Sequence, residues 1–278
     1  MSYRTILVHA NLSRHAEARY RLAALLARTF DAHLVGAAVT GVSRFILPGS
    51  MEMGGQMLAE QIGILHEAAQ RALAQFETVT TRLDVRARES RYVNDDLDGG
   101  IALQARYADL IVLGQPDPSE QLVDGRSDLL ETLLMAAARP LLVQPYANAS
   151  ATFGTHPLVA WDGSVEATRA ITSALPLLRE ARLVTVAVFD PDGRPGAHGE
   201  QPGADIALYL SRHGVPVQVH VQPGTVDTGN ALLSLAADLD SDLLVMGGYG
   251  HSRFREMLLG GVTRTILNSM TIPVLMAH

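Results

Sequence analysis

Residues 242–250 read Asp-Leu-Leu-Val-Met-Gly-Gly-Tyr-Gly, and residues 260–263 read Gly-Gly-Val-Thr. A short apolar strand therefore runs directly into a glycine turn, and a second glycine pair opens the next helix. The strand has a counterpart earlier in the chain, Asp109-Leu-Ile-Val-Leu-Gly114. In both copies a proline, Pro140 or Pro273, lies 31 residues after the aspartate (109 to 140, 242 to 273). A repeat without a gap predicts two copies of one domain.

The beginnings of the two copies also correspond. Ile6-Leu-Val-His-Ala-Asn-Leu-Ser13 parallels Pro157-Leu-Val-Ala-Trp-Asp-Gly-Ser164, so Asn11 stands where the second copy has Asp162. The offset is 151 residues here and 133 in the later match, which predicts about 18 extra residues in the first copy, placed at 41–57. The linker rich in turn residues between Pro145 and His156 predicts domains at residues 1–146 and 154–278.

Each copy alternates apolar strands with segments of helical apolar spacing. In the first copy the expected strands are 5–9, 33–39, 83–87, 110–113 and 140–143, and the expected helices are 16–29, 58–76, 97–105 and 127–138. In the second copy the expected strands are 158–161, 183–189, 217–221, 243–246 and 274–276, and the expected helices are 165–179, 204–212, 228–237 and 262–270. This alternation predicts an α/β fold with two tandem doubly wound domains, each a five-stranded parallel sheet in the order 3-2-1-4-5 flanked by helices.

In such a sheet, ligands bind beyond the carboxyl ends of the strands, where the strand order reverses. Asp162 follows the first strand of the second copy and Gly247 follows its fourth, so the two meet at that point. Glycines let backbone N–H groups approach a phosphate closely, especially at a helix N-terminus. Asp162 supplies an acceptor for a ribose or base, and the end of the second strand near Val188 supplies an apolar slot. The second copy is therefore predicted to hold a nucleotide.

The first copy acts as an internal control for this prediction. It has Asp117, Ser127 and Asp128 at the positions of Gly250, Gly260 and Gly261. If the first copy folds in the same way, the fold does not require those glycines. Two carboxylates at these places repel phosphate. We therefore expect no nucleotide site in the first copy.

Over essentially its whole length the chain resembles a tandem universal stress protein. Nucleotide-binding members of that family carry Gly-x2-Gly-x9-Gly-(Ser/Thr) between the fourth strand and the last helix, and this chain has Gly247-x2-Gly250-x9-Gly260-Gly261. Gly261 replaces the Ser or Thr. The resemblance implies ATP or another adenine nucleotide, with or without Mg²⁺, held by Asp162, Val188, Gly247, Gly248, Gly250, His251, Gly260, Gly261, Val262 and Thr263.

The resemblance also implies a role in the stress response, weak ATP hydrolysis at most, and pairing of the two domains or of two chains through the final strands, 141–144 and 274–276. Two alternatives stay open. One is a non-nucleotide interaction module that binds a partner or an apolar ligand through the Met-rich stretch 41–57. The other is a nucleotide-using enzyme such as an ATP pyrophosphatase, although Trp161-Asp-Gly-Ser164 differs from the Ser-Gly-Gly-x-Asp-Ser loop of that class.

Net charge and cysteine content exclude several classes of function. The net charge of −7 argues against a general nucleic-acid binder and against docking on an anionic membrane. The absence of cysteine excludes disulfides and thiolate metal sites. No histidine pair has metal-ligand spacing, so no metal site and no catalytic residue are predicted. We expect a cytoplasmic protein with His9 in the core and with Ser13 and Ser164 as helix N-caps.

Overall fold

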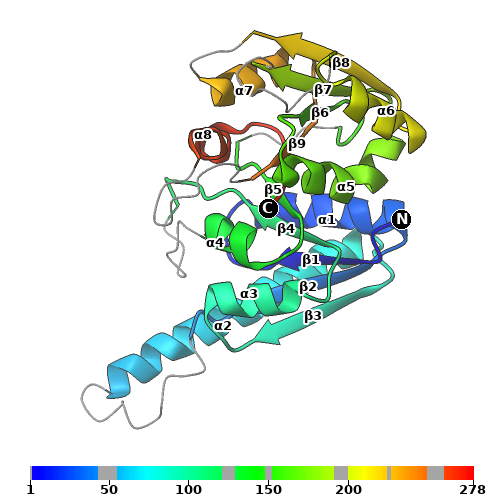
Figure 1. Cartoon of the computed structure of the whole chain (residues 1–278). Helices are drawn as coiled ribbons and strands as arrows, with labels where there is room; N and C mark the ends of the chain where they lie inside the picture. The colour runs from blue at the N-terminus through cyan, green and yellow to red at the C-terminus, as the bar shows by residue number, and fades with distance from the viewer. Residues whose placement is uncertain are drawn as a thin grey trace. The chain divides into compact units, whose positions relative to one another are not determined.

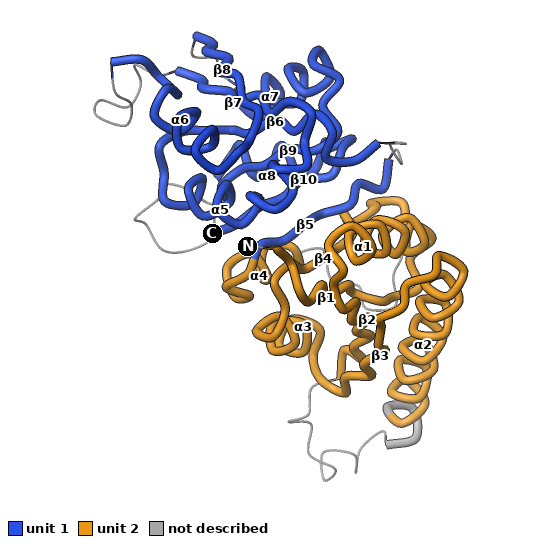
Figure 2. The backbone as a smooth tube through the Cα atoms, turned by 90° about the vertical axis from the view of Figure 1, so that its right-hand side faces the viewer, with its two compact units in different colours: residues 1, 140–278 blue, residues 2–139 orange. Residues whose placement is uncertain are grey.

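A computed structural model describes residues 2–42, 55–120, 129–147, 152–190, 200–223, 227–248 and 260–278 (Figure 1). The chain divides between Arg139 and Pro140 into two compact units (Figure 2), here called the N-terminal unit and the C-terminal unit. The predicted domain limits, 1–146 and 154–278, rest on the repeat and stay predictions. No helix in the described ranges is long and apolar enough to cross a membrane.

The N-terminal unit is a parallel sheet in the order β3-β2-β1-β4. Its strands are β1 (Thr5–His9), β2 (His33–Val39), β3 (Arg88–Val93) and β4 (Leu110–Gly114). Its helices are α1 (Ala16–Phe30), α2 (Gly55–Arg82), α3 (Leu97–Ala105) and α4 (Leu129–Ala136). The central strands β1 and β4 are apolar and almost fully buried, as expected for strands covered on both faces. Most of the Met-rich stretch 41–57 lies outside the described residues: residues 43–54 are not described, and of 55–57 only the backbone, at the start of α2, is.

The C-terminal unit contains a parallel sheet in the order β8-β7-β6-β9-β10, which confirms the predicted order 3-2-1-4-5. The strands are β6 (Pro157–Ala160), β7 (Val184–Phe189), β8 (Val217–Gln222), β9 (Leu243–Gly247) and β10 (Val274–Ala277). The helices are α5 (Val165–Glu180), α6 (Ala204–Arg212), α7 (Thr228–Asp238) and α8 (Gly261–Ser269). The doubly wound α/β class is therefore confirmed.

One strand of the first copy falls in the other compact unit. Strand β5 (Leu141–Gln144), expected as the fifth strand of the first domain, belongs to the C-terminal unit and pairs antiparallel with β10. Leu142 stands opposite Leu275 in this ladder. Both strands are apolar and fully buried, and the pairing covers a strand edge that would otherwise be exposed. The sheet of the C-terminal unit is thus not purely parallel.

The predicted strand at 83–87 is wrong. Residues 83–85 close the end of α2, where the Val85 N–H donates to the Thr80 carbonyl and Asp84 adopts a positive φ of 54°. Val85 is buried because it packs beneath this turn, which imitates the alternation of a strand. The actual strand β3, Arg-Glu-Ser-Arg-Tyr-Val, pairs only with β2 among the described residues, and this edge position tolerates its polar sequence.

The helix caps agree with the prediction in one unit only. Ser164 caps α5, because its Oγ accepts a hydrogen bond from the Ala167 N–H at 3.1 Å. Ser13 is not the N-cap of α1; that position is His15, and the Ser13 hydroxyl donates to Glu120. The first copy therefore uses the equivalent serine to attach a distant loop.

Candidate functional site

Asp162 and Gly247 follow two neighbouring strands of the C-terminal unit. Strands β6 and β9 pair in parallel through Leu158–Leu244 and Val159–Val245, so their carboxyl ends lie side by side. Asp162 comes two residues after β6, and Gly247 is the last residue of β9. The structure thus brings these two predicted site residues to the same edge of the sheet, at the point where the strand order reverses.

Asp162 is half-buried in the turn that leads from β6 into α5. Its Oδ1 accepts a hydrogen bond from the Ser164 N–H at 3.0 Å, and Gly163 between them has a φ of 74°. Asn11 makes the same contact with the Ser13 N–H, at 3.2 Å, in the N-terminal unit. A neutral amide therefore suffices for this turn, and the negative charge of Asp162 is an addition that the turn does not need.

Val188 lies at the carboxyl end of β7, one residue beyond the last pair with β6, Ala160–Ala187. Its side chain is fully buried and points toward Gly203 at the start of α6, since a Cβ on that glycine would lie 3.1 Å from Val188 Cγ2. Val188 therefore contributes its backbone, and not its side chain, to the edge beside Trp161 and Asp162.

Gly247 is a glycine for a structural reason. A Cβ at this position would lie 2.6 Å from the backbone nitrogen of Ala167 and 2.7 Å from the carbonyl carbon of Glu166, in the first turn of α5. No other residue permits this approach of β9 to the α5 backbone without a shift. Packing therefore explains the first glycine of the spaced glycine motif that begins at Gly247.

Gly260 and Gly261 differ from Gly247 in this respect. Gly260 is the N-cap of α8 with φ −54° and ψ 130°, and Gly261 is the first residue of the helix. A Cβ at either position would meet no described atom within 4 Å, and neither glycine has a positive φ. Both are exposed. Neither backbone conformation nor packing in the described part of the unit requires glycine at these two positions.

The remaining predicted loop residues are placed as follows. The Gly248 N–H donates to the Ala277 carbonyl at 2.9 Å, so this amide is already engaged with the final strand. Val262 is half-buried, and Thr263, which is 4% exposed, is buried and has a partner of its own. The hydroxyl of Thr263 therefore does not substitute at the surface for the one missing at Gly261. Gly250 and His251 lie outside the described residues.

The corresponding place in the N-terminal unit is filled by Arg19, which the sequence did not single out. Arg19 is 2% exposed; its Nε donates to the His9 carbonyl at 2.9 Å and its Nη2 to Asn11 Oδ1 at 2.6 Å. A Cβ on Gly114, at the end of β4, would lie 2.3 Å from Arg19 Nη1. The repeat places Ala170 at the position of Arg19 in the second copy. A guanidinium thus occupies the carboxyl ends of β1 and β4.

His9 is buried beside this arginine, as predicted for a core histidine. Burial, and to a lesser extent the charge of Arg19, lower the pKa of His9 to about 3. The imidazole is therefore neutral throughout the physiological pH range. It forms part of the packing of the N-terminal unit.

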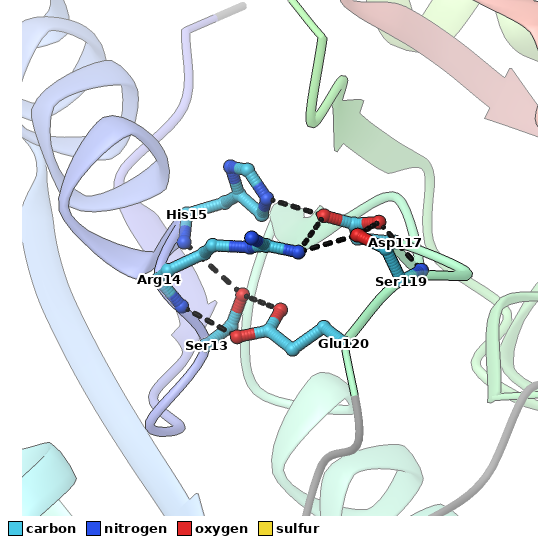
Figure 3. A network of polar contacts seen from close by, with 6 residues as sticks. All are labelled: Ser13, Arg14, His15, Asp117, Ser119 and Glu120. Atoms are coloured by element: carbon cyan, nitrogen blue, oxygen red, sulfur yellow. Dashed lines mark hydrogen bonds and ion pairs between the residues drawn. The ribbon is translucent and has the colours of Figure 1, made fainter.

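A polar cluster joins the start of α1 to the loop after β4 in the same unit (Figure 3). It consists of Ser13, Arg14, His15, Asp117, Ser119 and Glu120. Asp117 Oδ2 accepts from Arg14 Nη2 at 2.7 Å and lies 2.9 Å from His15 Nε2. Glu120 accepts from the Arg14 N–H at 2.7 Å and from the Ser13 hydroxyl at 2.8 Å. Hydrogen bonds from Ser119 and His15 hold the pKa of Asp117 far below its usual range.

Sequence spacing gave no signal for this cluster, because 102 residues separate His15 from Asp117. The repeat does place Asp117 at the position of Gly250, so the comparison of the two copies identified one member without its partners. In the N-terminal unit, carboxylates thus stand on the loop where the second copy has its glycine loop.

Comparison with known proteins agrees with this architecture. Residues 156–278 match the Universal stress protein family. The matched residues contain all the parallel strands of the C-terminal unit, from β6 to β10. The resemblance predicted from the sequence is thereby confirmed. The chain is 28% identical over 170 residues to Universal stress protein Slr1230 of Synechocystis sp.; the match covers 60% of this chain and 57% of that relative.

Solved structures extend the likeness to both units. A universal stress protein from Archaeoglobus fulgidus has a TM-score of 0.73 at 17% identity, with 98% of this chain and 95% of that chain covered. A Pseudomonas aeruginosa protein described as functionally unknown has a TM-score of 0.63 at 18% identity, with 99% and 92% covered. At these identities the comparison shows that the fold of the universal stress proteins continues through the N-terminal unit.

Proposed function

We propose that this universal stress protein binds one adenine nucleotide per chain, ATP, at the carboxyl ends of β6 and β9 in the C-terminal unit. The observation that carries the proposal is that, among the described residues, no atom lies within 4 Å of a Cβ placed on Gly260 or Gly261 at the N-terminus of α8. Glycine is explained by packing at Gly247 but not at these two positions. A ligand that needs close access to the backbone explains them.

The chemistry of this edge suits a nucleotide. The first N–H groups of α8 have no partners within their own helix, and the helix dipole favours an anion there. A phosphate chain at Gly260 and Gly261 supplies that anion. Asp162 supplies an acceptor for ribose hydroxyls, and the backbone of Val188 borders an adenine beside the exposed turn. Mg²⁺ would be held by the phosphates together with the Asp162 carboxylate, the one acidic predicted site residue, so the donor set fits a phosphate-bound ion.

The N-terminal unit lacks the corresponding features. Arg19 fills the carboxyl ends of β1 and β4, and the loop after β4 carries Asp117 at the position of Gly250. These observations support a stoichiometry of one nucleotide per chain. A role in the stress response, cytoplasmic location, association of two chains, and pairing of the domains through β5 and β10 belong to the same proposal. Weak hydrolysis of ATP stays a prediction.

Calorimetric titration of the full chain with ATP tests the proposal, with two substitutions at one position. Gly260 is an N-cap, where Asp and Asn both stabilise a helix slightly better than Gly. We expect Gly260→Asn to retain ATP and Gly260→Asp to lose it, because only Asp adds a charge that repels phosphate. Gly63→Asp, at an exposed glycine of α2 with no atom within 4 Å, adds the same charge elsewhere and should bind normally.

Both Gly260 variants should fold at least as well as the wild type, so a loss of binding cannot be assigned to unfolding. At about 1 mM ATP even a weak complex would be detected. If the wild type binds no ATP at this concentration, the proposed nucleotide site is wrong. That result would favour the alternative of an interaction module. Equal binding by Gly260→Asp and wild type would place the ligand away from α8.

A further inference from the structure

The polar cluster of the N-terminal unit contains a set of metal-ligand atoms. His15, Asp117 and Glu120 each offer one atom, and the three atoms lie within 4.8 Å of one another. It is the one such group in the part of the chain that the structure describes. All three residues are half-exposed; the side chain of His15 is 26% exposed and that of Asp117 is 8% exposed. An ion could therefore enter from solvent and still be partly shielded.

The ligand atoms are held in place by donors on their far side. Asp117 Oδ1 accepts from the Ser119 N–H at 2.8 Å and from the Ser119 hydroxyl at 2.7 Å, which leaves Oδ2 toward His15 Nε2. Glu120 Oε1 is held by the Arg14 N–H. Carboxylates that ligate metals are usually fixed by such second hydrogen bonds, which orient the oxygen that faces the ion. Figure 3 shows the His15 imidazole facing the Asp117 carboxylate, and the Glu120 carboxylate facing Ser13 and the Arg14 backbone.

The charge of Asp117 is now paired with that of Arg14. Its Nη2 lies 2.7 Å from the same Asp117 Oδ2 that faces His15, but its side chain is 55% exposed. A long, largely solvated side chain can turn into water at little cost, since exposed ion pairs are weak. A divalent cation at this place would gain two carboxylates and a neutral imidazole, and the guanidinium would leave. Arg14 is therefore a competitor for the ion.

We propose that His15, Asp117 and Glu120 form a site for a first-row divalent metal ion of the Zn²⁺ type, which displaces the Arg14 guanidinium on binding. One imidazole and two carboxylates with an open fourth position suit Zn²⁺, and the absence of thiolates argues against softer ions. In this proposal the loop after β4 of the N-terminal unit binds a cation, whereas the corresponding part of the C-terminal unit is proposed to bind an anion. The proposal does not depend on nucleotide binding.

Titration of the full chain with Zn²⁺ after chelator treatment, in a buffer that does not bind zinc, tests the site. We expect one saturable Zn²⁺ per chain from these residues. His15→Gln and Asp117→Asn should each weaken binding about tenfold or more. Arg14→Ala should strengthen binding about tenfold, because it removes a positive charge next to the ion and leaves the backbone N–H that holds Glu120. A purely structural ion-pair network predicts no gain of affinity in Arg14→Ala.

The matched control is His33→Gln. His33 and Glu89 form a second, exposed His–carboxylate pair in the same unit, with 3.6 Å between His33 Nε2 and Glu89 Oε2, but without a third ligand. Zinc affinity should be unchanged in this variant. No saturable binding by the wild type below about 1 mM Zn²⁺, or equal affinity in His15→Gln, overturns the proposal. Equal affinity in Arg14→Ala and wild type overturns it as well, and circular dichroism checks that each variant is folded.

Discussion

The Cα of Gly247, at the end of β9, faces the backbone nitrogen of Ala167 in the first turn of α5, so closely that a Cβ would lie 2.6 Å from it. The contact joins the strand and the helix that flank Asp162 and fixes the end of β9 beside the turn after β6. One glycine of the motif therefore serves the fold, whereas packing against the described residues does not require the two at the start of α8.

This distinction predicts opposite effects of the same substitution. Gly247→Ala should destabilise the C-terminal unit by about 1–3 kcal/mol, because backbone atoms cannot move aside without shifting α5. Gly261→Ala should be neutral or stabilise by up to about 1 kcal/mol, because alanine favours the helix and meets no described atom. The single tryptophan, Trp161, lies in this unit and reports its unfolding in denaturant. Equal destabilisation by both variants would contradict the assignment.

The hydroxyl that the family motif has at position 261 is missing here, and restoring it should strengthen nucleotide binding. Gly261→Ser places an Oγ at the first residue of α8, where it can donate to a phosphate oxygen. A hydrogen bond to a charged group contributes about 1.5–3 kcal/mol, so the affinity for ATP should rise about tenfold or more. Gly261→Ala is the control without the hydroxyl. If the serine and alanine variants bind ATP equally in calorimetry, no phosphate lies at this position.

The variant Asp162→Asn keeps the side-chain oxygen that the turn uses and removes the negative charge, so it tests these two roles of Asp162 separately. Because Asn11 makes the same turn in the other unit, the variant should keep its stability to within about 0.5 kcal/mol. Loss of the carboxylate should lower ATP affinity about tenfold, since hydrogen bonds to an ionised acceptor are roughly twice as strong as neutral ones. Calorimetry and the Trp161 unfolding curve measure the two effects on one sample. Unchanged affinity would show that Asp162 serves the turn alone.

The sequence predicted most strands because they are short apolar runs. It predicted that Asp162 and Gly247 lie at one edge of the sheet because alternating strands and helices indicate a doubly wound strand order. Strand assignment failed where a strand is polar or where a buried residue lies outside a strand. Strand β3 is polar because it lies at an edge, and the buried Val85 of a helix end imitated a strand. The polar cluster was missed because its members are distant in the chain, with 102 residues between His15 and Asp117. Such contacts are created by folding and leave no local pattern.

The buried His9 should make the N-terminal unit sensitive to acid well above the range of carboxylates. Its pKa is lowered from 6.5 to about 3 in the folded state. Between these values the unfolded chain binds the proton and the folded one does not, so stability is full above pH 6.5 and falls as the pH decreases, by about 1.4 kcal/mol per unit. The pKa of Asp117 is lowered as well, and its contribution to stability is lost only as the pH falls below its unfolded pKa of 3.8.

The difference between wild type and His9→Gln isolates this effect, because other titrating groups are common to both. Stability of the N-terminal unit, followed by hydrogen exchange of the buried β1 amides at pH 4.5, 5.5 and 6.5, should fall more steeply with acid in the wild type. The two slopes should differ by about 1 kcal/mol per pH unit. Parallel slopes would mean that His9 gains its proton without unfolding, and that the pocket around Arg19 admits a second positive charge.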